Sequence, residues 1–284
     1  MQTHIKDQIN LHFIVFVWGF TAILGKFISI DALALVFNRT AITSVAIGLY
    51  LLLRRKSFQA NSRDLLFMWL CGVLIAVHWI TFFGAIKIAN ISITLAGIST
   101  GALWTALLNP ILTKSKIDWT ELGLGLLVIL GIVIVFYEEP NSASLERYSL
   151  GSLSFTNFQI GLIIALFSAM LSASFSILNK KLVSRYPRPI QVTFWELSFA
   201  FLSILIYQLI FGTDTLMSLW ASSYSNLLFL AILALLCTAY PFIKSVELLK
   251  RMSPFSVMLA INLEPVYGIS VSYTHLTLPT ISSV

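Results

Sequence analysis

The residue of this sequence best placed for chemistry is Glu264, a carboxylic acid inside the apolar segment KRMSPFSVMLAINLEPVYG, residues 250–268. Glu264 lies ten residues beyond Pro254, which corresponds to about 15 Å at the rise of an α-helix. The hydrocarbon core of a bilayer is about 30 Å thick, so a spanning helix places this acid near the middle. Charge at that depth is costly and favours a functional site facing a cavity or partner. The alternative is a solvated acid beside a helix kink, because Pro265 follows directly.

Arg39 and His78 also fall inside apolar runs. Arg39 lies about 10 Å from the nearer end of its run, so its side chain either extends to the interface or faces a partner across a cavity. His78 is polar at depth, which favours a cavity position. The aromatic residues at comparable depth either pack against helices and lipid or form a cavity wall; they are Trp18, Trp79, Trp104 and Tyr240. Glu196 and Lys244 lie close enough to span ends to reach the interface.

Residues 97–101, Gly-Ile-Ser-Thr-Gly, match the G-x-S-x-G pattern of hydrolases. An intramembrane serine hydrolase using Ser99 and His78 is therefore the alternative function. Glycines four residues apart also form a helix-packing face in membranes, and we favour that interpretation. The sequence contains no H-E-x-x-H, Walker A or C-x-x-C pattern, so we expect no metal and no cofactor.

Composition indicates a membrane protein. Hydrophobic residues make up 58% of the 284 residues and charged residues 11%, and the mean hydropathy is +0.89, whereas soluble domains carry about 25% charged residues. Cys71 and Cys237 lie in apolar stretches, so we expect free thiols. The net charge of +6 follows membrane topology, as shown below, and we expect no nucleic-acid partner.

Nine apolar runs are long enough to be considered as spans. They are continuous, without alternation, and therefore favour helices over barrel strands. They cover residues 11–30, 32–53, 65–86, 91–112, 121–137, 160–178, 191–211, 227–249 and 256 onward. A polar stretch, residues 138–157, separates the first five runs from the rest.

Lysine and arginine at the span ends predict the orientation. With the N-terminus in the cytoplasm, thirteen of these cations lie inside and three outside, which is a strong positive-inside pattern. The inside set is Lys6, Arg54, Arg55, Lys56, Arg63, Lys114, Lys116, Lys180, Lys181, Arg185, Arg188, Lys250 and Arg251. The outside set is Lys26, Lys87 and Arg147.

The two halves of the sequence resemble each other. Residues 65–67 and 227–229 both read Leu-Leu-Phe, 162 residues apart, and the same offset pairs His78 with Tyr240. Gly101 and Glu264 are 163 apart, and Trp18 and Ser172 are 154 apart; we attribute the drift to loop lengths. Five spans per half is an odd number, so the second half must be inverted, and such repeats place a substrate site near the midplane.

Small residues predict close helix packing. The sixth run carries serines and alanines at four-residue spacing, and the fifth run carries Gly123 and Gly131. The sixth-run residues are Ala165, Ser168, Ala169, Ser172, Ala173 and Ser176.

The chain resembles the drug/metabolite transporter (DMT) superfamily, specifically ten-span permeases built from two EamA domains. The residues that carry the resemblance are Trp18-Gly19 with Lys26, Arg39 with Ala41, Asn109-Pro110, Gly123 to Gly131, and LKRMSPFSVMLAINLEPVYG at Leu249–Gly268. The resemblance implies an all-α integral membrane fold of two inverted five-helix repeats. It also implies export of small metabolites or amino acids, often by proton exchange, through a pathway between the halves.

We therefore expect a first EamA repeat at 11–137, a periplasmic connecting loop at 138–157 and a second repeat at 158–270. Two departures from the family pattern stand out. The chain reads Lys114-Ser115-Lys116 where the family usually has a glutamate. Residues 271–280 resemble a translated sequencing adapter, so we expect 271–284 to be a non-native tail and the last helix of the repeat to be missing. The alternative is a genuine polar tail.

The sequence thus predicts a multi-pass transporter of amino-acid or drug-like solutes and not an enzyme. We place it in a bacterial inner membrane, working by alternating access and coupled to protons, with no indication of oligomeric state. The expected partners are lipid, a small solute and protons. Glu264 would meet protons or a substrate amine, and Arg39 a substrate carboxylate. The expected cavity wall consists of Trp18, His78, Trp79, Trp104 and Tyr240.

The orientation can be tested by cysteine labelling in intact cells. A cysteine at Ser142, in the connecting loop, should react with an impermeant reagent from outside, and one at Ser57 only after the membrane is opened. The reverse pattern would show that the cation count misassigns the two faces.

Overall fold

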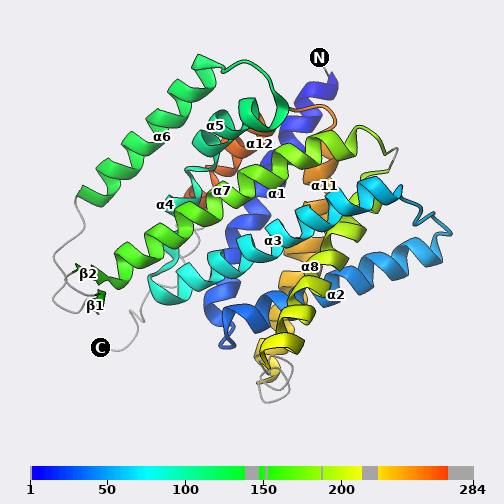
Figure 1. Cartoon of the computed structure of the whole chain (residues 1–284), viewed down its shortest axis with the longest axis horizontal. Helices are drawn as coiled ribbons and strands as arrows, with labels where there is room; N and C mark the ends of the chain where they lie inside the picture. Colours follow the sequence, from blue (N-terminus) through cyan, green and yellow to red (C-terminus); the bar gives the residue numbers. More distant parts are fainter. Residues whose placement is uncertain (1, 138–146, 151–152, 187, 213–222, 268–284) are drawn as a thin grey trace, which may run out of the picture.

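The structure, a computed structural model, describes residues 2–137, 147–150, 153–186, 188–212 and 223–267 and consists mainly of long helices (Figure 1). The first half contains α1 (Gln2–Phe27), α2 (Ala32–Leu53), α3 (Ser62–Ile88), α4 (Ile91–Ile98), α5 (Gly101–Thr113) and α6 (Trp119–Tyr137). The second half contains α7 (Asn157–Val183), α8 (Pro189–Phe211), α10 (Tyr224–Ala234), the π-helix η1 (Leu235–Ala239), α11 (Tyr240–Leu248) and α12 (Pro254–Ile261). The predicted helical membrane fold is confirmed.

Seven helical segments of the described chain are long and apolar enough to cross a membrane. The helices α4 and α5 together form one of them, and α10, η1 and α11 form another. The predicted fifth run corresponds to α6, and the ninth begins as α12. Large apolar side chains such as Ile111 and Leu209, 72% and 76% exposed, cover the outside, as expected where lipid replaces water. The predicted tail at 271–284 lies outside the described residues.

A short hairpin precedes the second half of the bundle. Strands β1 (Arg147–Leu150) and β2 (Leu153–Thr156) pair antiparallel, with Arg147 opposite Thr156. The hairpin occupies part of the predicted loop and was not expected from the sequence. Thr156 then starts α7 through a capping box with Gln159, so the polar connection ends where the helical backbone needs its first acceptor.

Polar contacts at one end of the bundle show that the second half is inverted. Arg251, after α11, binds Asp7 near the start of α1 through contacts of 2.7 and 2.8 Å. These contacts raise the pKa of Arg251 above its ordinary value. Arg185, after α7, binds Asp64 near the start of α3 at 2.6 Å. Helices that begin at this end in the first half therefore correspond to helices that finish there in the second.

The repeat is exact in the broken helices α4 and α12. Each has eight residues, and their first residues are 163 apart. Asn90 and Ser253, again 163 apart, cap them by accepting a hydrogen bond from the backbone N–H of Ile93 and Ser256 respectively. After a short break the backbone is helical again, from Gly101 in the first half and from Glu264 in the second. Discontinuous membrane helices of this kind border the substrate sites of transporters built from inverted repeats.

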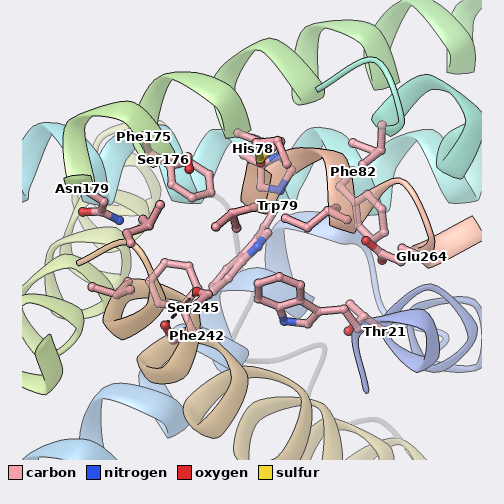
Figure 2. Close-up of a pocket in the computed structure, with 18 of the residues that line it drawn as sticks. Thr21, His78, Trp79, Phe82, Phe175, Ser176, Asn179, Phe242, Ser245 and Glu264 are labelled. Atoms are coloured by element: carbon pink, nitrogen blue, oxygen red, sulfur yellow. Dashed lines mark hydrogen bonds between the residues drawn. The ribbon is translucent and has the colours of Figure 1, made fainter. Parts of the chain in front are cut away.

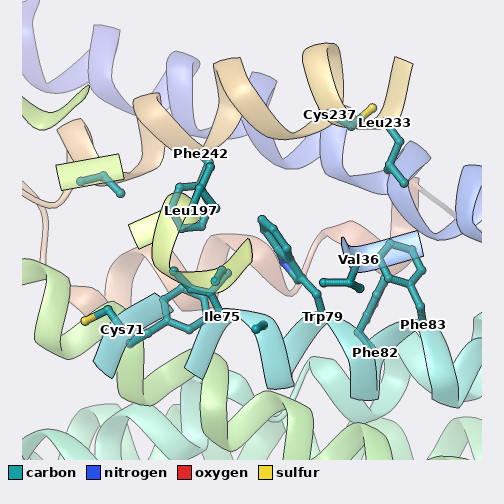
Figure 3. Packing of buried hydrophobic residues seen from close by; sticks show 14 of the residues in the cluster. Val36, Cys71, Ile75, Trp79, Phe82, Phe83, Leu197, Leu233, Cys237 and Phe242 are labelled. Carbon is teal, nitrogen blue, oxygen red and sulfur yellow. The ribbon is translucent and has the colours of Figure 1, made fainter. Parts of the chain in front are cut away.

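Helix α3 forms the centre of the bundle and packs against both α7 and α8 (Figure 1). Figure 3 shows Ile75, Trp79 and Phe83 on α3 within the buried cluster that also contains Leu197 of α8 and Phe242 of α11. Close approach depends on small residues. A Cβ atom at Gly72 would lie 2.6 Å from the Glu196 carbonyl oxygen, so α3 and α8 touch along their backbones.

The prediction that small residues mark packed helix faces is confirmed for α7 and is wrong for the two glycines chosen on α6. The six predicted α7 residues are all buried, and a Cβ atom at Gly97 would lie 2.5 Å from the Ala165 Cβ. Within the described part of the chain, Gly123 and Gly131 face open space, whereas Gly125 lies against Leu103 of α5. The eight-residue spacing of Gly123 and Gly131 therefore did not indicate which face of α6 packs.

Two alanine substitutions should separate packing from helix propensity. Gly97→Ala should destabilise the protein by about 1–3 kcal/mol, because the added methyl overlaps Ala165. Gly123→Ala meets nothing within 4 Å and should stabilise by about 0.5–1 kcal/mol through helix propensity alone. Thermal unfolding in detergent compares them, and equal shifts would contradict the α4–α7 contact.

Candidate functional site

A cavity of about 90 Å³ lies between the two halves of the bundle. About 10–15 Å³ suffices for one water molecule, so the cavity has room for several. Five of the seven predicted site residues line it, namely Trp18, Arg39, His78, Trp79 and Glu264. Figure 2 shows Asn179 at one end and Glu264 at the other, with His78 and Trp79 between them. The lining residues come from α1, α2, α3, α4, α7, α11 and α12, with Leu249 directly after α11 and Glu264 at the start of the helical stretch that follows α12.

Arg39 is the largest polar side chain in the core and is only 2% exposed. Its guanidinium carbon lies 4.0 Å from the centre of the Trp79 ring, and its Nε donates to the Thr238 hydroxyl at 2.6 Å. The buried Nη1 has no hydrogen-bond partner. Stacking over an indole and one neutral acceptor hold the group in place, but they leave part of its donor capacity free at the cavity.

The π-helix η1 presents Thr238 to Arg39. An i→i+5 turn takes in one residue more than an α-helical turn and often occurs at functional sites. The Thr238 hydroxyl donates to the Leu233 carbonyl at 2.6 Å, five residues back, while accepting from Arg39. Thr43, one turn along α2 from Arg39, donates to the Ala234 carbonyl at 3.0 Å. Thr238 of the irregular turn thus accepts a hydrogen bond from the buried guanidinium of Arg39, and Thr43 of the same helix as Arg39 donates to the carbonyl that precedes the turn.

The extra residue of η1 also explains the position of Tyr240. The repeat offset is 162 at the helix caps Asn61 and Ser223, and 163 at α4 and α12. The π-helix η1 lies within this span, and its extra residue accounts for the one-residue change. After η1, Phe242 is the residue 163 positions from Trp79, and the two rings are in edge-to-face contact with their centroids 5.8 Å apart. Tyr240 is 44% exposed and packs against Phe13 outside the cavity.

His78 is held from α7. Its Nδ1 lies 2.9 Å from the Ser168 carbonyl oxygen, and the Ser168 hydroxyl donates to the His78 carbonyl at 2.8 Å. An Nδ1–H that donates to a carbonyl leaves Nε2 as the ring nitrogen available to a ligand. The ring also packs against Phe175 at 5.6 Å. This reciprocal pair fixes the orientation of the imidazole in the cavity wall.

Glu264 follows the helix break at Asn262 and Leu263 and is 6% exposed. Within the described residues, the four ion pairs include neither Glu264 nor Arg39. The carboxyl group and the guanidinium thus share the cavity without closing on each other. An acid and a base separated in this way can each contact a different group of one small molecule.

Several cavity residues were not predicted as site residues, among them Thr21, Phe175, Asn179, Phe242 and Ser245. The repeat contained part of the information. The offset of 154 that pairs Trp18 with Ser172 also pairs Thr21 with Phe175, and all four line the cavity. Trp104, by contrast, was expected at the wall but packs partly buried against the core and does not line the cavity.

Ser99 has no catalytic arrangement. Its hydroxyl donates to the Leu95 carbonyl at 2.9 Å in its own helix, while His78 is bound to Ser168. The serine-hydrolase alternative finds no support. Among the described residues, no group of three or more His, Cys, Asp or Glu side chains is arranged to hold a metal ion.

Glu196 and Lys244 were expected to reach the interface. Lys244 is half-exposed and pairs with Glu247 at 2.9 Å. Glu196 is completely buried, so the expectation that its side chain reaches the interface is wrong. The close backbone contact between α3 and α8 at Gly72 encloses it.

Fold and cavity together define a membrane protein with two inverted helical repeats around a central polar site. A profile of the EamA-like transporter family matches residues 9–137 and 159–278. The chain belongs to this family. No curated protein matches the chain. A solved structure described only as "Crystal structure of protein" superposes with a TM-score of 0.68 at 15% identity, covering 95% of this chain and 88% of that one; this likeness concerns the fold alone.

The contact between Arg39 and η1 predicts a stability difference between two substitutions of one residue. Thr238→Val keeps the shape but removes the acceptor of the buried Nε, and should cost about 1–3 kcal/mol. Thr238→Ser keeps the hydroxyl and should remain near the wild type. Thermal unfolding in detergent measures both, and equal stability of the two variants would show that the hydrogen bond contributes nothing.

Proposed function

We propose that this transporter moves small amino-acid-like solutes out of the cell in exchange for protons. Its family supports membrane transport in general, and the chemistry of the cavity supports the solute class. The observation that carries the proposal is the unpartnered Nη1 of Arg39, buried at a cavity that also contains the carboxyl group of Glu264. Drug-like solutes that carry both a carboxylate and an amine could use the same two protein groups.

In this proposal Arg39 binds the carboxylate of the solute. A buried guanidinium with a free donor gains most from an anionic acceptor, because charge-assisted hydrogen bonds are about twice as strong as neutral ones. The stacking of Arg39 on Trp79 holds the donor in position before the solute arrives. Trp18 and Phe242 supply apolar surface for a side chain.

Glu264 would bind either a proton or the amine of the solute, but not both. A carboxyl group in an apolar membrane site is stable when it is neutral or paired, and no cation pairs with Glu264 among the described residues. Competition between proton and amine for one carboxylate couples their movements. The helix break before Glu264 supports a site at which one repeat moves against the other.

We further propose that the protein lies in the bacterial inner membrane with its N-terminus in the cytoplasm. The thirteen-to-three split of lysine and arginine between the two faces supports this orientation. Lys180, Arg185, Lys250 and Arg251, all from the cation-rich set, lie together with Asp7 and Asp64 at one end of the bundle. That end would face the cytoplasm.

A binding and transport assay on the full chain in liposomes tests the proposal. The twenty amino acids are screened for stabilisation and for exchange of labelled solute; the best is then compared with its decarboxylated amine. The amine should bind about 10- to 100-fold more weakly, the value of one charge-assisted hydrogen bond of about 1.5–3 kcal/mol. Arg39→Gln should abolish that preference. Accumulation driven by a pH gradient should be lost in Glu264→Gln, whereas exchange persists.

Ser99→Ala is the matched control, since its hydroxyl bonds only within its own helix, and it should transport like the wild type. No variant should cleave membrane peptides. If no amino acid binds or moves, or if the amine and the amino acid bind the wild type equally, the proposed solute class is wrong.

A further inference from the structure

A second buried acid, Glu196 on α8, lies outside the cavity just described. It is 0% exposed, and neither carboxyl oxygen has a hydrogen-bond partner. Its polar neighbours are the thiol of Cys71 on α3 and the amide of Asn179 on α7. The Asn179 side-chain oxygen is itself buried without a partner. Side chains from three helices therefore form a buried polar cluster around Glu196.

The cluster contains no cation that could balance a negative charge. None of the four ion pairs in the described part of the chain involves Glu196. Helices α2, α3, α7 and α11 pack against α8, and the titratable group among them that faces the carboxyl group is Cys71. An isolated carboxylate in an apolar interior takes up a proton rather than remain charged. The surroundings of Glu196 therefore offer no compensation for a negative charge.

The repeat assigns a counterpart to Glu196. Helices α2 and α8 begin after caps at Asp31 and Arg188, 157 residues apart, and the same offset pairs Arg39 with Glu196. Contacts around the two residues correspond as well. Thr43 reaches Ala234 on α10, and the equivalent Ala200 adjoins Gly72 on α3. The two repeats therefore place a base and an acid at equivalent positions.

Asn179 connects Glu196 with the cavity. It lines the cavity at the end opposite Glu264 (Figure 2), and its amide also neighbours the carboxyl group of Glu196. The free Asn179 oxygen is itself enclosed, so water of the cavity would reach it, and the acid, through movement of the surrounding helices. Small displacements of α7 or α8 would then let the proton of Glu196 pass to water, leaving the carboxylate and a hydrated proton.

We propose that Glu196, with Asn179 and Cys71, forms a second proton-binding site that exchanges its proton with the central cavity. It is separate from Glu264 and lies at the repeat position of Arg39. Because inverted-repeat transporters open alternately on each side of one central site, the equivalent position on α8 is the one to become accessible when the halves rearrange. Use of this proton in coupling rests on the proposed function; the existence of the site does not.

Infrared spectroscopy of the full chain in lipid nanodiscs tests the site without any solute. At neutral pH the wild type should show carbonyl bands of protonated carboxylic acids, and Glu196→Gln should lose one of them. Glu264→Gln, the matched control, should keep that band. Cys71→Ser and Asn179→Leu keep the acid but change its neighbours, so each should shift the frequency of the same band. These two variants assign the band even if Glu196→Gln does not fold.

Exchange into D₂O tests the connection to the cavity. The Glu196 band should shift on deuteration in the wild type, and this shift should slow several-fold in Asn179→Leu. A spectrum unchanged by all substitutions at Glu196, Cys71 and Asn179 would show an ionised Glu196 and overturn the proposal. A band that never deuterates, or deuterates equally fast in Asn179→Leu, would overturn the connection. None of these results depends on transport, so failure of the amino-acid assay would leave them interpretable.

Discussion

The burial of one guanidinium constrains much of this structure. Arg39 cannot lose its charge, and a charge inside a membrane-embedded bundle is tolerated only where it has partners or faces a cavity. Trp79 provides the face beneath it and Thr238 the acceptor. Thr238 is available because η1 departs from α-helical geometry, and Thr43 in turn satisfies the Ala234 carbonyl next to η1. The cavity, the irregular helix and the packing of α2 on α10 therefore depend on the same group.

Inverted repeats explain how polar residues from distant parts of the chain meet. The two halves supply matching broken helices, α4 and α12, with matching caps at Asn90 and Ser253. Ile98 and Ile261, 163 residues apart, line the cavity from the ends of these helices. Even the lysines correspond: Lys87 donates to the Ile28 carbonyl at one end of the bundle, and Lys250 to the Tyr186 carbonyl at the other. A site at the boundary of two such halves needs no dedicated loop.

The sequence predicted the helices, the inversion and five of the residues that line the cavity, because each follows from properties that a linear pattern contains. Apolar runs must span the bilayer, and Arg39 and Glu264 are conspicuous in such runs. Tyr240 was misplaced because a single inserted residue turns every later side chain around the helix axis, and nothing in the composition of residues 235–239 marks a π-turn. The sequence placed Glu196 near the end of a span but could not show that it is buried. The contact at Gly72 that encloses it depends on tertiary packing. The packing face of α6 was missed for the same reason, since spacing does not say which glycine meets a neighbour.

The differences between the halves are as informative as their likeness. At equivalent positions after the two helix breaks, one half has Gly101 and the other Glu264; a Cβ atom on Gly101 would lie 2.4 Å from the end of the Met258 side chain. The absence of a side chain at Gly101 thus lets α12 approach α5, whereas the equivalent position in the second half carries the acid Glu264. In α2 and α8 the exchange is between Arg39 and Glu196. Arg39 and Glu264 line the cavity, whereas their repeat counterparts Glu196 and Gly101 do not. This asymmetry gives the cavity one basic group and one acidic group.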